Sequence, residues 1–331
     1  MTEHNRAWHL VRRPMGVPTT DCFQLVDSPL GPLAEGQVRV RNRFLSLDPY
    51  MRGRMDESRS YAAPQELNAV MQGGTVGEVV ESRHPRFKVG DAVVTRAGWQ
   101  LFGTSDGSDL RRIDSARVPM QAWLGAVGMP GVTAWYGIND ILKPEHGQTL
   151  VVSAASGAVG AVVGQLARQR GAKVIGIAGG AEKCRIVVEE FGFDACVDYK
   201  AGNLAADLSA AARGGIDCLF ENVGGVCLDA CLAAMNPFGR IAVCGLISGY
   251  SGQATPIHNL RSILINRLSV QGFIISEHMD RWPPALAELS ELAASGRLRW
   301  RETIAEGLEQ APQAFLGLLR GDNVGKQLVR L

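Results

Sequence analysis

The sequence predicts an α/β fold that combines a doubly wound parallel-sheet domain with a β-rich domain. The length of 331 residues suits two domains, and a hydrophobic content of 46% is ample for their cores. From Leu150 onward, short apolar segments alternate with helical patterns, as in a parallel sheet whose strands are joined by helices. The N-terminal third lacks this alternation and contains short, β-branched segments bounded by turns.

The β-rich domain begins with a strand over residues 37–44 that alternates strictly between apolar and polar residues, as a half-buried strand does. Residues 73–82 and 89–95 are further short strands. Residues 325–331 are again strand-like, so we expect the chain to return to this domain at its end. The first strand carries a basic cluster that we expect to lie on a solvated face: Arg39, Arg41 and Arg43.

The most informative segment is a strand, a tight turn and a helix over residues 150–168. Its small residues follow the pattern G-x-G-x-x-G, with Ala155 in place of the first glycine and with Gly157 and Gly160 kept. Such a turn lets a backbone approach a pyrophosphate closely, and the helix start offers unpaired N–H groups to its charge. The turn residues predicted to bind a dinucleotide are Ala155, Ser156, Gly157, Ala158 and Val159.

Taken alone, this degraded motif also fits any tight strand-to-helix turn. The apolar segment 172–178 that follows completes a strand–helix–strand crossover and favours the dinucleotide site. In NAD sites, an acid about 20 positions beyond the glycines binds the ribose 2′-hydroxyl. That position falls at residues 178–180 here, and no acid is present.

The residues around that position favour a 2′-phosphate, and hence NADPH. Gly179 stands where the acid would be, Lys183 follows it, and Tyr199 ends the short strand 195–199. A lysine attracts a phosphate and a phenol can donate to it, whereas a carboxylate would repel it. The alternative is that Lys183 is a solvated helix residue beside Glu182.

Three further strand-like segments continue the alternation: 216–221, 241–245 and 268–275. A turn is predicted at residues 236–239, before the second of them. The loops after the first two segments are expected at the carboxyl ends of parallel strands, where such sheets bind ligands. The third segment lies near the end of the sheet. Because an apolar edge strand aggregates unless it is paired, we expect a two-fold homodimer through it.

The composition excludes several classes of function. Lysine plus arginine number 34 against 33 aspartate plus glutamate, a formal net charge of +1, which argues against a nucleic-acid-binding surface. No apolar run approaches the ~20 residues that span a bilayer, and the first residues lack the plan of a signal peptide. Seven cysteines, an odd number, suit reduced thiols. We therefore expect a cytoplasmic protein with a small-molecule substrate and no membrane or nucleic-acid partner.

No metal site is expected. Cys227 and Cys231 lie four residues apart on one helical face, but no second pair or nearby histidine completes a zinc site. The six histidines are scattered along the chain, and each is expected to be a surface or packing residue.

Six segments, in order and across nearly the whole chain, match a known family. They are residues 45–52 (L-S-L-D-P-Y-M-R), 128–135 (G-M-P-G-V-T-A-W), 154–160, 221–225, 244–250 and 321–326. On these segments the chain resembles the zinc-independent medium-chain dehydrogenase/reductases, and within them the NADPH-dependent alkenal, prostaglandin and curcumin double-bond reductases. Trp135 stands where the family usually has tyrosine, and we expect a packing change there.

The resemblance implies a Rossmann domain that binds NADPH, residues 128–299, a GroES-like substrate domain, residues 1–127 and 300–331, and a cleft between them. Zinc-dependent relatives carry a four-cysteine lobe ahead of the Rossmann domain. No cysteine lies between Cys22 and Cys184 here, so this lobe cannot form. Without a metal as Lewis acid, nothing stabilises an alkoxide. A conjugated C=C bond is an easier substrate, because hydride adds to the β-carbon and one donor can hold the charge on the carbonyl oxygen.

The resemblance also assigns roles to single residues. Tyr250 matches the phenol above the nicotinamide and substrate, and Tyr50 matches a phenol on the opposite wall of the cleft. A phenol can donate to a developing enolate, although each of the two could instead only shape the pocket. Asp48 is expected to cap its loop before Pro49 rather than act as an acid. Further cofactor contacts are expected from Met129, Thr133, Asn222, Cys244, Ser248, Tyr250, Phe273 and Asn323.

For three of these residues a structural role is the alternative: core packing for Met129 and Thr133, and a turn position for Asn323. The predicted function is the NADPH-dependent reduction of the C=C bond of α,β-unsaturated aldehydes or ketones. Two other functions remain open at this point, an NADPH quinone reductase and a non-catalytic NADPH-binding protein.

Overall fold

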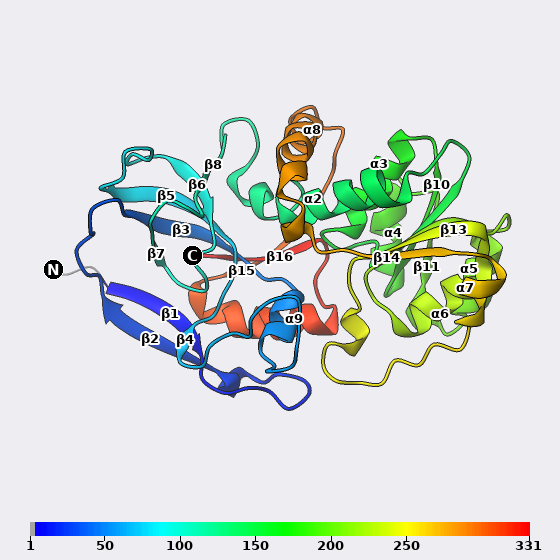
Figure 1. Cartoon of the computed structure of the whole chain (residues 1–331), viewed down its shortest axis with the longest axis horizontal. Helices are drawn as coiled ribbons and strands as arrows, with labels where there is room; N and C mark the ends of the chain where they lie inside the picture. Colours follow the sequence, from blue (N-terminus) through cyan, green and yellow to red (C-terminus); the bar gives the residue numbers. More distant parts are fainter. Residues whose placement is uncertain (1–3) are drawn as a thin grey trace. The chain divides into compact units, whose positions relative to one another are not determined.

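The computed structural model describes residues 4–331 and contains two compact units (Figure 1). The first unit runs to Leu124 and includes Glu302–Leu331, whereas the second unit is the continuous stretch Gly125–Arg301. The sequence predicts one domain of residues 1–127 and 300–331 and another of residues 128–299. That these two parts fold independently stays a prediction.

The first unit is built around two β-sheets. The smaller sheet has the order β2-β1-β4, and the larger one has the order β15-β16-β3-β5-β6-β8, with β7 also paired to β3. The strands are β1 (His4–Leu10), β2 (Phe23–Pro29), β3 (Val38–Ser46), β4 (Ala69–Val70), β5 (Thr75–Ser82), β6 (Ala92–Thr95), β7 (Phe102–Ser105), β8 (Arg111–Arg112), β15 (Glu302–Glu306) and β16 (Lys326–Arg330). Helical segments described in this unit are η1 (Thr20–Cys22), α1 (Tyr50–Arg54), η2 (Met120–Leu124), η8 (Leu308–Gln310) and α9 (Ala311–Arg320).

Strand β16 lies inside the larger sheet, between β15 and β3. It runs parallel to β15 and antiparallel to β3. Its residues Leu328 and Val329 are fully buried. The strand predicted near the C-terminus is therefore confirmed, and it joins a strand from early in the chain to one from its last thirty residues.

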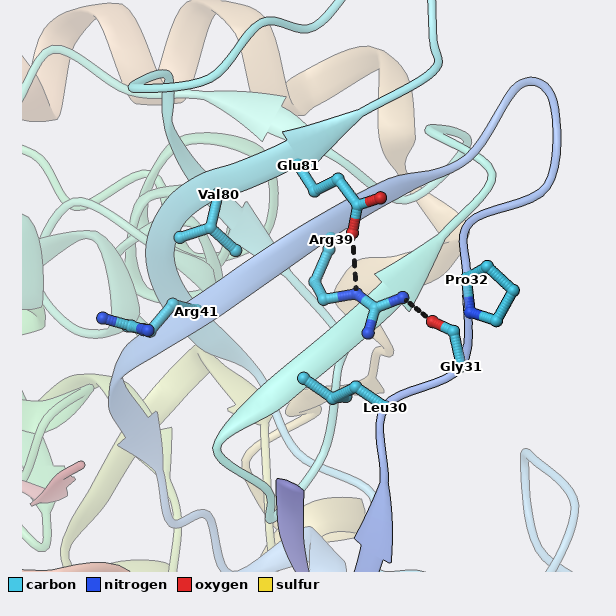
Figure 2. A pocket seen from close by; sticks show the side chains of 7 residues that line it. All are labelled: Leu30, Gly31, Pro32, Arg39, Arg41, Val80 and Glu81. Atoms are coloured by element: carbon cyan, nitrogen blue, oxygen red, sulfur yellow. Dashed lines mark hydrogen bonds and ion pairs between the residues drawn. The ribbon is translucent and has the colours of Figure 1, made fainter. Parts of the chain in front are cut away.

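The expectation of a solvated arginine face on β3 is wrong for Arg39, which is only 5% exposed. Its Nη2 donates to the Gly31 carbonyl oxygen at 2.5 Å, and its Nε lies 3.7 Å from the Glu81 carboxylate (Figure 2). Arg41 is half-buried, and only Arg43 is exposed. Alternation along a strand identifies the two faces, but it does not reveal whether a loop, here the one containing Gly31, covers the polar face.

The second unit contains a six-stranded sheet of order β11-β10-β9-β12-β13-β14, in which every neighbouring pair is parallel. The strands are β9 (Thr149–Ser153), β10 (Lys173–Ala178), β11 (Ala195–Asp198), β12 (Ile216–Glu221), β13 (Met235–Val243) and β14 (Ser269–Gly272). From β9 the chain adds β10 and β11 on one side and β12, β13 and β14 on the other, so the strand order reverses between β9 and β12. This confirms the predicted doubly wound parallel sheet and the α/β fold class.

Helices connect these strands, and Figure 1 shows α3 and α6 on opposite sides of the sheet. The helices are α2 (Met129–Tyr136), α3 (Gly160–Gln169), α4 (Ala181–Glu189), α5 (Leu204–Ala211), α6 (Gly225–Ala234), α7 (Arg261–Ile265) and α8 (Trp282–Ala294). Shorter helical segments are η3 (Gly137–Leu142), η4 (Tyr199–Ala201), η5 (Ile247–Gly249), η6 (Ile275–Glu277) and η7 (Met279–Arg281). Within residues 4–331, no helix is both long and apolar enough to cross a membrane.

Strand β13 begins earlier than predicted, so the turn expected at residues 236–239 is part of the strand. Its pairing with β12 shifts at this point, because Met235 pairs with Ile216 whereas Arg240 pairs with Cys218. Phe238, inside the shift, has a φ of +63°. The residues with a turn-like composition therefore form an irregularity within the strand.

The last predicted strand, 268–275, is shorter in the structure and forms the edge strand β14, Ser269–Gly272. All four of its residues are exposed. The flanking residue Phe273 is buried and packs against the rings of Phe220 and Tyr136, with centroid distances of 6.1 and 5.4 Å. Some apolar residues of this segment, such as Phe273, thus lie in the core, whereas those of β14 lie at the exposed edge of the sheet.

Candidate functional site

The turn between β9 and α3 has the close backbone packing that a phosphate-binding turn needs. Ala154 adopts a φ of +51°, and a Cβ added to Gly160 would lie 2.4 Å from the Ala154 carbonyl oxygen. The Gly157 N–H donates to that same oxygen at 2.9 Å. Val159, the residue before α3, makes no side-chain hydrogen bond to the start of the helix. It therefore leaves the first N–H groups of α3 available to a ligand. These features fit a pyrophosphate.

The predicted turn residues lie together in this segment. Ala155 is fully buried and its N–H donates to the Ile177 carbonyl oxygen at 3.0 Å, which ties the turn to β10. Ser156 is buried as well. Gly157, Ala158 and Val159 are partly exposed, so their backbone is the part of the turn that a ligand can reach.

Hydrogen bonds hold the carboxyl ends of β9 and β12 together. The backbone N–H of Asn222 donates to Ser153 Oγ, and its side-chain Nδ2 donates to the Ser153 carbonyl oxygen, both at 2.8 Å. The fully buried Glu221 carboxylate accepts from Ser153 Oγ at 2.8 Å and from the Gly224 N–H at 2.7 Å. Burial raises the pKa of Glu221. The loop that begins at Asn222 is therefore fixed to the centre of the sheet.

The loop after β13 is bound to the loop after β12. The Cys244 N–H donates to the Glu221 carbonyl oxygen at 2.9 Å, and Ser248 Oγ donates to the Val223 carbonyl oxygen at 2.6 Å. These bonds bring Asn222, Cys244 and Ser248 into one cluster of loops at the carboxyl ends of neighbouring parallel strands. This is the end of a doubly wound sheet at which ligands bind.

Tyr250 belongs to the same cluster and follows η5 directly. Its hydroxyl oxygen accepts from the Leu246 N–H at 3.4 Å, and a Cβ added to Gly245 would lie 3.1 Å from that oxygen. The phenol thus packs back over the start of its own loop and is half-buried. Its hydroxyl lies beside the backbone that follows β13.

A second cluster lies at the carboxyl end of β10. A Cβ added to Gly179 would lie 2.8 Å from the Tyr199 ring, so a glycine is needed where the two residues meet. The Asp198 carboxylate accepts from the N–H groups of Gly180, at 2.7 Å, and Lys200, at 2.9 Å. These two bonds lower the pKa of Asp198. Asp198 therefore joins the loop after β10 to the end of β11.

The predicted Lys183 lies in the first turn of α4, which begins directly after that loop, and it is half-buried. The structure adds a residue that sequence reasoning missed. The Lys200 Nζ lies 6.0 Å from the centre of the Tyr199 ring. In the sequence, the signal for Lys200 is its position directly after Tyr199. Two lysines and a phenol thus flank the end of β10, a combination that suits a phosphate.

The residues predicted at the start of α2 are joined within the helix. Thr133 is buried, and its Oγ1 donates to the Met129 carbonyl oxygen at 2.8 Å. Trp135 donates its indole N–H to Glu288 at 2.6 Å and so connects α2 to α8. Thr133 and Phe273 therefore have packing roles, and their contacts with a cofactor stay predictions.

In the first unit, Asp48 does not cap its loop as expected. Its carboxylate forms a buried ion pair with Lys326, at 3.1 Å, and accepts from the Ser46 hydroxyl. The Lys326 Nζ also donates to the Leu47 carbonyl oxygen at 2.5 Å, and no side chain caps α1. A capping role was inferred from the neighbouring proline, but the partner of Asp48 comes from the far end of the chain.

Tyr50 is the first residue of α1 and packs against the core of the first unit. Burial, together with the nearby Asp48 carboxylate, raises the pKa of Tyr50, so its phenol stays protonated and can donate. Asn323 lies in the turn before β16, where its Nδ2 donates to the Gly325 carbonyl oxygen at 2.7 Å. Tyr50 and Asn323 thus belong to the first unit, and Tyr250 belongs to the second.

A cavity of about 490 Å³ opens beside β3 in the first unit (Figure 2). It is lined by Leu30, Gly31, Pro32, Arg39, Arg41, Val80 and Glu81. None of the predicted site residues lines it, and it contains no phenol. Arg39 is engaged with the Gly31 carbonyl oxygen and the Glu81 carboxylate, and the Arg41 guanidinium lies over the Phe102 ring. We therefore do not assign the reaction to this cavity.

No group of three or more histidine, cysteine or acidic residues in the described part of the chain is arranged to hold a metal ion. The seven cysteines are unbridged.

Comparisons with known proteins agree with these features. A family model described as the N-terminal domain of oxidoreductase matches residues 6–113, and one described as zinc-binding dehydrogenase matches residues 158–291. The chain is 44% identical to the NADPH-dependent curcumin reductase of Escherichia coli K12, over 99% of this chain and 97% of that protein. It is 40% identical to the NADP⁺-dependent 2-alkenal reductase of Nicotiana tabacum, over 90% and 88% of the two chains.

Among solved structures, the crystal structure of CurA from Vibrio vulnificus in complex with NADPH superposes with a TM-score of 0.94. The two sequences are 43% identical, and the match covers 98% of each chain.

Proposed function

The chain belongs to the medium-chain dehydrogenase/reductase family, and from this premise we propose that it reduces the C=C bond of α,β-unsaturated aldehydes or ketones. It is an NADPH-dependent reductase of that family. The substrate class and the roles of single residues are the proposal.

One arrangement carries the proposal. The phenol of Tyr250 lies in the loop cluster at the carboxyl ends of β12 and β13, on the sheet whose strand β9 leads into the phosphate-binding turn. Nucleotides bind at this end of a doubly wound sheet, next to the point where strand order reverses. For an enone, a hydrogen-bond donor to the carbonyl oxygen is sufficient. For an alcohol substrate it is not, because a metal is needed to stabilise the alkoxide.

Bound NADPH would supply the hydride that adds to the β-carbon of the substrate. The Tyr250 hydroxyl would donate a hydrogen bond to the carbonyl oxygen, on which the negative charge collects, and a proton from water added at the α-carbon would give the saturated product. The Leu246 N–H, which donates to the same phenol oxygen at 3.4 Å, orients the ring and polarises the O–H group. A donor held in place before the reaction stabilises an enolate without reorganisation.

The first unit contributes residues that position the substrate. Tyr50 keeps its proton because burial raises the pKa of its phenol, so it can donate to a carbonyl oxygen. The buried Asp48–Lys326 pair fixes the loop that leads into α1 and so fixes Tyr50. Asn323 is proposed to reach the nicotinamide half of the cofactor, with its Nδ2 held by the Gly325 carbonyl oxygen.

Cofactor selection is proposed to occur at the end of β10. Lys183 and Tyr199 would bind the 2′-phosphate. Lys200, which lies beside the Tyr199 ring, would bind it as well. Gly179 lets the phenol approach the backbone. The turn after β9 contributes residues 155–159, and the loops after β12 and β13 contribute Asn222, Cys244 and Ser248.

We also propose that the protein forms a two-fold homodimer through β14. This strand is the open edge of the sheet, and all four of its residues are exposed. Exposed edge strands with apolar neighbours are stable in solution when they are paired.

The proposed function is tested by following a labelled hydride. The protein is given NADPH that carries deuterium at C4 of the nicotinamide, together with an acyclic enone, a 2-alkenal, the matching saturated ketone or a quinone. We expect deuterium at the β-carbon of the saturated product from the enone and the alkenal, and no turnover of the saturated ketone. Turnover of the quinone alone would assign a quinone reductase, and no NADPH consumption with any substrate would leave only cofactor binding.

A further inference from the structure

Two cysteine sulfurs meet beside the loop after β10. The Cys196 thiol donates to the Cys184 sulfur with an Sγ–Sγ distance of 3.1 Å. Cys184 lies in α4 and Cys196 lies in β11, so the contact joins two different elements of the second unit. Neither thiol participates in the proposed reaction.

The packing around the pair holds both sulfurs in place and leaves them partly accessible. Cys196 pairs in register with Gly176 on β10, and a Cβ added to Gly176 would lie 3.3 Å from the Cys196 sulfur. The missing side chain leaves space that this sulfur shares with the Ala155 and Val187 side chains. Both cysteines are partly exposed, Cys184 on α4 and Cys196 on the edge strand β11, so a small oxidant can reach them.

The two sulfurs are in contact but not bonded. A disulfide bond is about 2.05 Å long, so bond formation requires the sulfurs to approach by about 1 Å. Small rotations about the two Cα–Cβ bonds can provide part of this movement, and a displacement of α4 relative to β11 provides the rest.

We propose that Cys184 and Cys196 are a modification site, a dithiol that a peroxide converts into a disulfide, and that this disulfide weakens the binding of the 2′-phosphate of NADPH. The peroxide first oxidises the Cys184 thiol to a sulfenic acid, and the O–O bond breaks to release water from hydrogen peroxide or an alcohol from an alkyl peroxide. The Cys196 sulfur then attacks the sulfenic sulfur, the S–S bond forms and water leaves. Two electrons pass from the two thiols to the peroxide.

The order of the two steps follows from the environments of the thiols. Burial raises the pKa of both, but the hydrogen bond from Cys196 opposes this rise at Cys184 and adds to it at Cys196. Cys184 is therefore the thiol that ionises more easily and reacts first.

The link to the cofactor rests on the proposed function. Lys183 precedes Cys184 in α4, and Tyr199 follows Cys196 by three residues. The loop between β10 and α4 is tied to β11 by the Asp198 carboxylate and the Gly180 N–H. A movement of α4 toward β11 therefore displaces Lys183 relative to Tyr199, and a charged contact to a phosphate is sensitive to such a displacement.

The experiment uses the full chain, reduced and then treated with hydrogen peroxide, with free thiols blocked before digestion and mass spectrometry. We expect one cross-linked peptide, Cys184 to Cys196, and the loss of two of the seven thiols. The dissociation constant for NADPH should rise roughly 3- to 30-fold in the oxidised protein, by loss of a charge-assisted contact. The constant for NADH should not change, and dithiothreitol should reverse the effect.

Matched variants separate the pair from the other thiols. Cys184→Ser and Cys196→Ser should form no intramolecular disulfide and should keep their NADPH affinity under peroxide. Cys227→Ser, which changes a fully buried thiol on α6, should behave as the wild type. A protein that loses no thiols, or that forms another bridge, overturns the modification site.

A 184–196 disulfide with unchanged NADPH affinity overturns its coupling to the cofactor. A reduced protein that fails to bind NADPH would instead contradict the proposed function, and the mass spectra would still decide whether the bridge forms.

Discussion

We propose that single residues at the end of β10 decide the choice of cofactor, and Lys183 is the one to change. Lys183→Ala should weaken NADPH binding by roughly 1–3 kcal/mol, the contribution of a hydrogen bond to a charged group. Binding of NADH, which has no 2′-phosphate, should be almost unaffected. Fluorescence titration of both cofactors measures the two dissociation constants. Lys173→Ala, at the amino end of the same strand, is the matched control. An equal loss for the two cofactors would contradict the 2′-phosphate assignment.

The two phenols should contribute differently to turnover. If the Tyr250 hydroxyl stabilises the enolate, Tyr250→Phe should lower kcat/KM by roughly 10- to 1,000-fold, the upper end being the loss of one oxyanion donor. NADPH affinity should barely change, because the ring still packs beside Gly245. Tyr50→Phe should lose less, mainly through a higher KM, if this phenol only positions the substrate.

Steady-state kinetics with one enone measure kcat and KM for both variants. Tyr136→Phe, which removes a phenol from the core of the second unit, should behave as the wild type. A wild-type kcat in Tyr250→Phe would mean that another donor stabilises the enolate, and the reductase assignment would survive.

Residues of the site differ in how far the sequence reveals them. Tyr250, Asn222 and Ser248 were assigned from the resemblance to known reductases. The loops that carry them could be located because each loop follows a recognisable strand of a parallel sheet, and their clustering is a consequence of that topology. The ion pair of Asp48 could not be located, since its partner Lys326 is more than 270 residues away and no local pattern links them. Lys200 was missed because an exposed lysine in a three-residue helical segment, η4, carries no periodic signal.

The buried Asp48–Lys326 pair connects the loop before α1 to β16 and should support the stability of the first unit. Lys326→Met should lower the free energy of unfolding by roughly 3–5 kcal/mol, because it leaves a buried carboxylate without its cation. The double variant Asp48→Asn, Lys326→Met should lose less. Urea unfolding measures these differences, with Arg43→Met, which breaks an exposed pair with Glu78, as the control. A loss as small as that of the control would contradict the role of the pair.

The sheet edge at β14 should form the interface between two copies of the chain. Val270, on this strand, is 47% exposed, and Leu264, on the preceding helix α7, is 79% exposed. Light scattering after size-exclusion chromatography should give a dimer at micromolar concentration. Val270→Asp should shift it toward monomer, whereas Val89→Asp, at an exposed site in the first unit, should not. A monomeric wild type would refute this interface.

Elements were predictable where a regular pattern runs through them. Strand β12 has the predicted bounds, because two glycines precede it and Asn222 follows it. Strand β13 was predicted too short, since Asn, Pro, Phe and Gly at 236–239 have a turn composition but are accommodated as an irregularity inside the strand. Arg39 is buried by a loop distant in sequence, which alternation within β3 cannot reveal.

At the scale of the whole molecule, catalysis should not depend on a metal. Dialysis against a chelator should leave full activity, and elemental analysis should find no stoichiometric zinc, because the described residues offer no group of ligands for it. The control is a zinc-dependent alcohol dehydrogenase treated in the same way. One tightly bound zinc per chain, with activity lost on its removal, would overturn the proposed mechanism. The cytoplasmic location inferred from the cysteine content stays a prediction.

The position of β16 has a consequence for how the protein is made. The second unit is continuous, and all strands of its sheet have been synthesised once Gly272 has been added. The larger sheet of the first unit is still incomplete at that point, because β3 waits for a strand whose Lys326 follows Leu47 by 279 residues. At ribosomal speed this delay is on the order of tens of seconds. During that time the backbone of β3 that pairs with β16 has no partner strand. The five residues of β16 are the last to enter a strand, and they provide this partner.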